Sequence, residues 1–494
     1  MDNKHRIFIQ KTFIALLVLP VLLTGCMDEF LDIEPEGSLS PKNFYENKED
    51  AVAAIYGVYE RLGTKELYNN DGILYILANA SDEARPFGAN DERVALNNYS
   101  YTQLNSITSG WWKVSYQIIN RANAVTDNVP DIDMDDSLRA SIIGEAQFLR
   151  ALAYFNLVRM FGEVPIVTEE TESFDEIDKP RASVDSVYAQ ITRDLTKAQQ
   201  ALPISYEDSG EKGRATVGAA KTLLAKVYLT RERWQEAADK AKEVMDSGTY
   251  QLYEDYAHVF LPDYENGEEH IFSIQFHAGD QNAGKQGRFW TYTAPNARKT
   301  NGISVASGGS SFGAIFPEKD YYDSYPEDYR KEVNFFKEWH FEKEDTTVTF
   351  DPHFFKYHDP GQTEAKRSSV NFPLFRYSEV LLMFAEAANE ANGGPTPPAY
   401  QAVNQVRQRA RFEKPDSVLP DLSGLSQAEF RKAVWRERHW EFAGEGKRWF
   451  DLKRTNRLIE IMQEDGKDIE EKHRRFPLPN IAIELNDWEQ NPGF

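Results

Sequence analysis

Residues 437–452 read ERHWEFAGEGKRWFDL, and this stretch says most about the fold. Two segments rich in tryptophan and phenylalanine flank a short turn with two glycines, which indicates two helices that meet at a turn. Glu437, Glu441, Arg448 and Asp451 all lie near that turn. Carboxylates and guanidinium groups so placed form charge-assisted hydrogen bonds. We therefore expect a partly buried network that fixes the crossing of the two helices.

Apolar residues at helical spacing predict more helices on both sides of this stretch. The pair from Thr216 to Met245 resembles a tetratricopeptide unit, because small residues let the helices approach and the period is near ~34 residues. Trp111 and Trp112 lie in a predicted helix, and we expect both in the core. Recurring helix pairs predict a mostly α fold, a tetratricopeptide-like superhelix. The predicted helices are 43–62, 111–125, 138–161, 184–202, 216–230, 231–245, 375–392 and 400–411, and a further helical block is predicted at 427–461.

The middle of the chain has a different pattern. From Tyr250 to Phe372, short β-prone runs such as Ile271–Phe276 alternate with clusters of Gly, Asn and Pro. This predicts a loop- and short-strand-rich insertion into the helical fold. We find no linker, so we expect residues 26–494 to form one unit. Its parts are an N-terminal helical repeat part at 26–249, the aromatic-rich insertion at 250–372 and a C-terminal helical part at 373–494.

The composition limits the partners. The 494 residues carry a formal net charge of −23, and so acidic a surface repels phosphate backbones, so we expect no nucleic-acid partner. Cys26 is the one cysteine, which excludes an intramolecular disulfide and a zinc site built on thiolates. Aromatic residues make up 13% of the chain, which fits either a large core or a surface that stacks on flat ligands.

The N-terminus resembles a bacterial lipoprotein signal. Basic residues precede the apolar run Phe13–Leu23, which is too short to span a bilayer and has the length of a signal-peptide core. The run ends in Leu23-Thr24-Gly25-Cys26, similar to a lipobox, in which the cysteine is acylated and becomes the first residue. We therefore predict a signal peptide at 1–25 and lipidation of Cys26, which tethers the chain to a membrane without spanning it.

Short motifs occur in a specific order along the whole mature chain. They are Asp32–Pro35, Gly144–Ala151, Phe161–Pro165, Asp328–Arg330, Phe375–Val380, Glu437–Leu452, Phe476–Pro479 and Gln490–Phe494. Each motif is weak by itself, but their order and spacing behind a lipobox are specific. Because of these motifs and their order, the chain resembles the SusD/RagB family from Cys26 to the last residue.

The resemblance implies a SusD-like fold and a non-enzymatic protein, lipid-anchored to the outer membrane at the cell surface. SusD-like proteins capture oligosaccharide or polysaccharide, or in some members peptide. They act as a hinged lid on a SusC-like TonB-dependent outer-membrane transporter. We therefore expect a glycan ligand, that transporter as partner, contact with the membrane through the lipid anchor only, and no cofactor. The sequence leaves open whether a Ca²⁺ ion with a structural role binds among the many acidic residues.

Two loops are the candidate binding regions, because sugars present apolar C–H faces and a rim of hydroxyls to aromatic and polar side chains. The first covers 67–101 and the second 280–311. We favour Trp290 and Tyr292, since a tryptophan in a loop rich in Gly and Asn has little reason to be core; the alternative is packing beneath a long loop. The candidate residues are Tyr75, Asp82, Arg85, Phe87 and Asn90, and Arg288, Phe289, Trp290, Tyr292 and Asn296.

Two other functions stay open on the sequence alone. One is a surface glycoside hydrolase with paired acids, in the loop region or near Glu441. A general acid needs a raised pKa, which salt-bridged acids lack, so we favour a structural role for the acids near the turn. The other is a repeat scaffold that binds only proteins, for which we expect the aromatic residues of the second loop to be buried. Loops set the specificity, so the sequence does not name the glycan.

Overall fold

The structure is a computed structural model that describes residues 44–88, 90–173, 178–208, 210–279, 285–296, 300, 305 and 311–494. The predicted lipidation residue Cys26 lies outside the described residues. The chain divides into two compact units, Met1–Glu46 and Asn47–Phe494, and the helices and strands named in this section belong to the second. About 53% of the chain is helical and its strands are few and short, which confirms the mostly α fold class.

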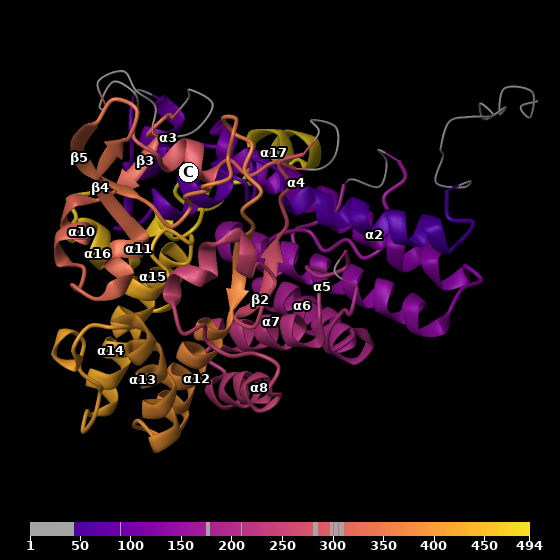
Figure 1. Ribbon diagram of the computed structural model, residues 1–494. Helices are drawn as coiled ribbons and strands as arrows, with labels where there is room; N and C mark the ends of the chain where they lie inside the picture. Colours follow the sequence, from indigo (N-terminus) through magenta and orange to yellow (C-terminus); the bar gives the residue numbers. More distant parts are fainter. Residues whose placement is uncertain are drawn as a thin grey trace, which may run out of the picture. The chain divides into compact units, whose positions relative to one another are not determined.

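Long helices of the N-terminal half pack side by side (Figure 1). In order they are α2 (Lys48–Leu62), α4 (Ser106–Asn128), α5 (Asp136–Phe161), α6 (Val184–Ala201), α7 (Val217–Thr230) and α8 (Trp234–Asp246). Helix α5 packs against α4 and α6, and α7 packs against α6 and α8. From Ser141 onward nearly every residue of α5 is buried, as a helix that is covered on all sides requires. Trp111 and Trp112 are buried in α4, as predicted.

The C-terminal half adds a second group of helices, joined to the first through α12 (Tyr377–Ala391). This helix packs against α7 and α8 on one side and against α13 (Pro397–Arg411) and α14 (Gln427–Glu441) on the other. The helical block predicted at 427–461 contains several helices. It divides into α14, α15 (Arg448–Arg454) and α16 (Leu458–Glu464), and α17 (Asn480–Asn486) comes after them.

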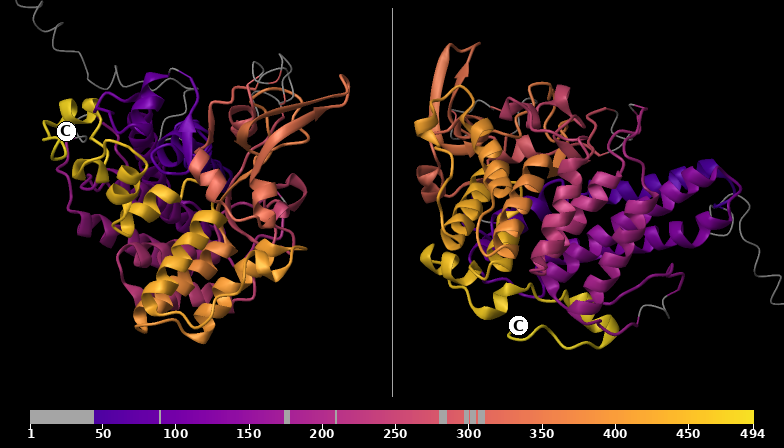
Figure 2. Two further views of the ribbon diagram at one scale, coloured as in Figure 1. Left: turned by 90° about the vertical axis from the view of Figure 1, so that its left-hand side faces the viewer. Right: turned by 90° about the horizontal axis from the view of Figure 1, so that it is seen from below.

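Among the described residues, the strands form three separate antiparallel pairs. They are β1 (Ala84–Pro86) with β3 (Ile315–Pro317), β2 (His270–Ile274) with β6 (Phe372–Arg376), and β4 (Phe335–Phe341) with β5 (Thr346–Phe354). The β4–β5 hairpin extends away from the helices (Figure 2). The short helices are a π-helix η3 (Asp71–Ala78), α3 (Asp91–Asn97), α9 (Phe289–Thr293), α10 (Lys319–Ser324), α11 (Tyr329–Asn334), and the 3₁₀ helices Val129–Asp131, Tyr256–Phe260, Pro262–Tyr264, Asp416–Val418 and Glu471–Arg474.

The charged network predicted at the turn is present and is larger than expected. Arg330, from the loop-rich part, lies 2.7 Å from Glu437 and 3.0 Å from Glu441 on α14. Arg376 at the end of β6 and Arg409 on α13 each lie 2.5 Å from Glu441. All of these side chains are buried. The network therefore joins β6, α11, α13 and α14, well beyond the two helices of the motif.

Glu441 is held as a carboxylate. Burial alone would raise its pKa, but Arg409, Arg376 and Arg330 outweigh burial and hold the pKa of Glu441 well below its usual range. A general acid needs the opposite shift. The buried ion pairs of Glu441 agree with the structural role predicted for the acids at the turn.

Candidate ligand-binding surface

The two predicted loops lie side by side in the structure. Strand β1 from the first loop pairs with β3, which comes directly after the second loop. The backbone N–H of Phe87 donates to the carbonyl of Ala314 at 2.9 Å. Tyr75 and Tyr292, one from each loop, meet edge to face with their ring centroids 6.5 Å apart. Residues more than 200 positions apart therefore lie together, and of these two rings Tyr75 is buried and Tyr292 is partly exposed.

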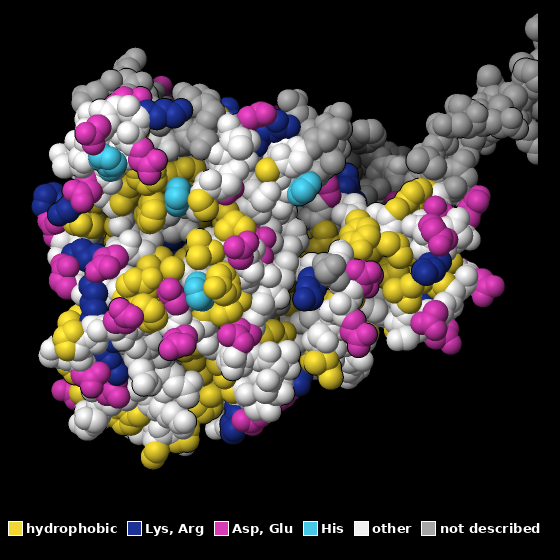
Figure 3. All heavy atoms as spheres, viewed as in Figure 1, with side chains coloured by type: hydrophobic (Ala, Val, Ile, Leu, Met, Phe, Trp, Pro, Cys, Tyr) yellow, Lys and Arg dark blue, Asp and Glu magenta, His cyan; other side chains and the backbone are white. Residues whose placement is uncertain are grey.

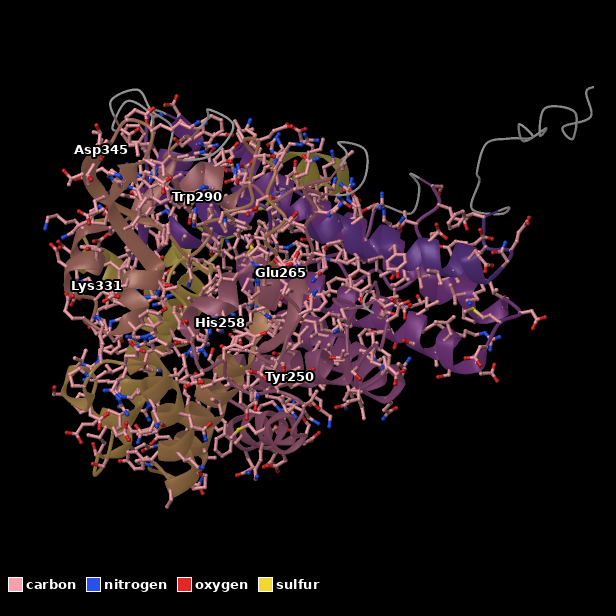
Figure 4. All side chains as sticks on the ribbon, viewed as in Figure 1. Tyr250, His258, Glu265, Trp290, Lys331 and Asp345 are labelled. Carbon is pink, nitrogen blue, oxygen red and sulfur yellow. The ribbon has the colours of Figure 1, made fainter. Side chains whose placement is uncertain are left out.

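Trp290 is buried, which corrects the prediction that it contacts the ligand. It is 1% exposed and packs with Val348 and Phe341 of the β4–β5 hairpin in one apolar cluster (Figure 4). Its ring lies 5.7 Å from Phe336 and 4.6 Å from His358. The structure therefore matches the alternative that Trp290 packs beneath a long loop.

Phe289 is buried as well. Its ring stacks on Tyr357, at 4.8 Å, and on Phe372, at 5.1 Å. Phe289 is 4% exposed, so its ring offers almost no surface to a ligand. The first turn of α9 thus anchors the second loop to the core.

Tyr292 is the partly exposed aromatic residue of α9. Phe312 meets its ring edge to face at 5.1 Å, in addition to the contact with Tyr75. Burial raises the pKa of Tyr292, with a further contribution from the Asp71 carboxylate. The positive charges of Arg288 and Arg93 act in the other direction. A half-buried ring among groups of both charges has the composition expected of a sugar-binding site.

Arg93 and Asp71 complete this group, which we call the Tyr292 cluster: Asp71, Arg93, Arg288, Tyr292 and Phe312. The guanidinium of Arg93 lies 3.8 Å over the ring of Tyr75 and its Nη2 atom is 3.9 Å from Asp71. Both side chains keep about a fifth of their surface exposed. Asp71 and Phe312 were not among the predicted residues, because nothing in their local sequence marks them.

Asp82 is committed to an internal ion pair. Both of its carboxylate oxygens accept hydrogen bonds from Arg448, at 2.7 and 2.6 Å. Burial opposes the charged form, but Arg448 and then His439 hold the pKa of Asp82 far below its usual range. This pair links the first loop to the start of α15. Its role in the structure is to position the loop, which corrects the prediction of a ligand contact.

Tyr75 is 0% exposed, which corrects its place among the predicted ligand contacts. The other predicted residues, Arg85, Phe87, Asn90, Arg288 and Asn296, are partly buried or exposed. Phe87 is 40% exposed, with its ring 5.8 Å from Phe316. The guanidinium of Arg85 lies 4.6 Å from the Phe316 ring centroid and 3.7 Å from Glu318. Asn90 is exposed and caps α3, accepting from the backbone N–H of Arg93. Asn296 is partly buried and donates to the carbonyl of Phe312 at 3.4 Å.

On the face shown in Figure 3, acidic and basic side chains are interspersed and hydrophobic side chains gather toward the middle. None of the helices among the described residues is long and apolar enough to cross a membrane. Within those same residues, no three His, Cys, Asp or Glu side chains come together as a metal site would need.

Fold and surface together define a helical-repeat protein whose candidate recognition surface is built by two loops. Two family descriptions match the chain: "Starch-binding associating with outer membrane" over residues 29–229 and "SusD family" over residues 316–493. The chain belongs to the SusD/RagB family.

Individual relatives agree with this assignment. SusD-like protein P25 of Formosa agariphila is 28% identical, over 95% of this chain and 96% of its own length. The crystal structure of a SusD superfamily protein from Parabacteroides distasonis has a TM-score of 0.80 at 25% identity, covering 92% of this chain and 100% of that one. A laminarin-binding SusD-like protein has a TM-score of 0.78 at 26% identity, covering 91% of this chain and 100% of that one.

Proposed function

We propose that this protein captures oligosaccharide or polysaccharide at the cell surface through the Tyr292 cluster. The observation that carries the proposal is the convergence of two loops that place a partly exposed ring beside Asp71, Arg93 and Arg288. Aromatic faces bind the C–H faces of sugars, and charged side chains bind the hydroxyl rim. Similarity to a laminarin-binding relative and to a family described as starch-binding supports a glycan ligand.

The proposal also includes the cellular location of the protein and its protein partner. Acylation of Cys26 would anchor the protein to the outer membrane, and the family description associates its members with that membrane. We propose that the protein serves as the lid of a SusC-like TonB-dependent transporter and delivers the glycan to it. The support for this partner is the SusD/RagB resemblance along the chain.

We propose further that the protein performs no catalysis. Glu437 and Glu441 are buried and paired with arginines, and Asp82 is paired with Arg448. A loop carboxyl with a raised pKa does exist: burial raises the pKa of Glu265 to about 7, and Asp359 adds to the shift (Figure 4). Glu265 accepts a hydrogen bond from the backbone N–H of Asn371, which gives it a structural use.

Native affinity electrophoresis of the chain from Asp28 to Phe494 tests capture, with laminarin first in a panel of polysaccharides. We expect one glycan class to slow the wild-type protein. Tyr292→Ala should weaken binding roughly tenfold, since aromatic contacts contribute about 0.5–1.5 kcal/mol beyond burial. Tyr56→Ala is the matched control, because Tyr56 is 40% exposed on α2.

The outcomes separate the alternatives. If Tyr292→Ala and Tyr56→Ala are slowed equally, the site is elsewhere; if no glycan slows the wild type, glycan capture is wrong and peptide cargo is the next candidate. Release of reducing sugar by the wild type, lost in Glu265→Gln, would instead establish a hydrolase.

A further inference from the structure

A cavity of about 40 Å³ lies where helices of the N-terminal and C-terminal halves meet. Its lining includes Arg159 of α5, Lys226 of α7 and Arg438 of α14. Apolar walls come from residues such as Phe155 and Phe450. A single water needs about 10–15 Å³ of such space, so the cavity has room for one small ion with water.

Arg159 carries a charge that no carboxylate balances directly. Its Nε atom donates to the carbonyl of Phe155 at 3.0 Å and its Nη2 atom to Asn156 Oδ1 at 2.6 Å. The rings of Phe155 and Phe450 lie 3.7 and 3.6 Å from the guanidinium. Within the described part of the chain, no carboxylate oxygen lies within 4.0 Å of this buried side chain. Arginine does not lose its proton in proteins, so the charge persists.

The cations next to Arg159 share too few carboxylates. Glu379 lies 2.7 Å from Lys226, 2.8 Å from Lys447 and 3.4 Å from Arg438, so one carboxylate serves three cations. The Nη1 atom of Arg438 is buried and has no hydrogen-bond partner among the described residues. Burial lowers the pKa of Lys226 to about 7 despite Glu379, and the positive charges of Lys447 and Arg159 add to the shift.

Other nearby carboxylates are already paired. Asp451 lies 2.9 Å from Arg438 and 2.8 Å from Arg454. Glu445 lies 2.9 Å from Lys356 and 2.8 Å from Arg376, and these two cations engage both of its oxygens. Arg454 also pairs with Glu386, at 2.6 Å. The lining of the cavity contains five basic side chains (Arg159, Lys226, Arg438, Lys447 and Arg454) and two acidic ones (Glu445 and Asp451), so the cavity carries an excess of positive charge.

We propose that this cavity binds a small monovalent anion of the halide class, held by Arg159 and Lys226. Taking a charge out of water without a counter-ion costs several kcal/mol in proteins, and a bound anion removes that cost. Guanidinium and ammonium donors together with aromatic walls suit a halide, which is compact and weakly hydrated. The anion would clamp α5 to α7. This site is separate from the Tyr292 cluster.

Thermal unfolding in matched salts tests the proposal. The melting temperature of the protein is measured in sodium chloride and in sodium gluconate at equal ionic strength, which keeps screening constant. Above the dissociation constant we expect a rise of about 1–2 °C for each tenfold increase in chloride. Arg159→Met keeps the apolar stem, removes the charge and should abolish this dependence. Arg233→Met changes an exposed arginine and should retain it.

Diffraction gives a second readout that does not depend on a variant that folds. Crystals of the wild-type protein soaked in sodium bromide should show an anomalous peak inside the cavity. Absence of that peak would overturn the proposal and leave a cavity that holds water only. A chloride effect of equal size in the wild type and in Arg159→Met would also overturn it, since the anion would then bind elsewhere.

Discussion

Burial of individual rings separates packing residues from candidate ligand contacts. Trp290 and Tyr292 are two positions apart on α9, yet the first is 1% exposed and the second is partly exposed. Loop composition places both in one aromatic segment but does not tell which ring faces inward. The rings that cover Trp290, such as Phe336 and Phe355, come from β4 and from the segment after β5. No local pattern connects them to Trp290, so its burial could not be predicted.

Trp290→Ala is therefore predicted to affect stability. Truncation of a buried tryptophan lowers the free energy of unfolding by about 3–5 kcal/mol through lost contacts and the cavity left behind. Guanidinium unfolding of the wild type and the variant measures this difference. Tyr56→Ala, at an exposed position, should change the free energy by no more than about 0.5 kcal/mol. Unchanged stability of Trp290→Ala would contradict its place in the core.

The helices show how far local sequence patterns determine elements. The prediction 184–202 matches α6 (Val184–Ala201), and 138–161 matches α5 (Asp136–Phe161). Caps explain the accuracy: Asp135 accepts from the backbone N–H of Leu138 at the start of α5, and Gly162 ends that helix with a φ of 84°. Within the predicted helical block 427–461, Gly444 and Gly446, with φ of 70° and 67°, turn the chain between α14 and α15, where the two glycines of the motif predicted a turn.

Gly446 is predicted to be the less replaceable of two glycines with similar backbone angles. A Cβ at Gly446 would lie 2.3 Å from Cδ1 of Ile73, which is itself buried, whereas a Cβ at Gly248 would meet no atom within 4 Å. Both positions have positive φ, so Gly248→Ala should cost about 1–2 kcal/mol from backbone strain alone. Gly446→Ala should cost about 2–4 kcal/mol, because overpacking adds to the strain. If both variants lose the same free energy of unfolding in urea, the helix η3, which carries Ile73, must move to make room for the added methyl group, and the prediction is wrong.

Across the unit Asn47–Phe494, the buried arginine–carboxylate network connects segments far apart in the chain. Arg376 at the end of β6 bonds Glu269 before β2 and Glu441 on α14, and Arg409 on α13 bonds the same two carboxylates. The motif at 437–452 indicated such a network but not its partners, because those lie in the irregular part and on other helices. The fold class could thus be predicted from periodicity and motifs, while the tertiary partners could not.

This network predicts a pH dependence of stability. The folded-state pKa of Glu441 is depressed, so its contribution is present above the unfolded pKa of about 4.3 and is lost as pH falls below it. Glu441→Gln should cost about 3–5 kcal/mol at pH 7, because it breaks a buried pair. The difference from the wild type should then shrink by about 1.4 kcal/mol per pH unit below about 4.3. Denaturant midpoints at pH 7 and pH 3.5 measure it.

The control for this series is Glu236→Gln, which removes an exposed ion pair with Arg233 on α8. Exposed pairs contribute about 0–1 kcal/mol. A gap between wild type and Glu441→Gln that stays constant from pH 7 to pH 3.5 would show that the Glu441 carboxylate does not carry the stabilisation.

Glycan capture at Tyr292 is tested most directly by isothermal titration calorimetry with the oligosaccharide of the glycan class that slows the protein on gels. We predict a dissociation constant between about 1 µM and 1 mM for the wild type, as for a single open site. Tyr292→Ala should bind roughly tenfold more weakly, while Tyr56→Ala and Trp290→Ala, where they are folded, should retain the wild-type affinity. If Tyr292→Ala binds the oligosaccharide with the wild-type affinity, and only another variant binds it more weakly, the ligand does not bind at the Tyr292 cluster.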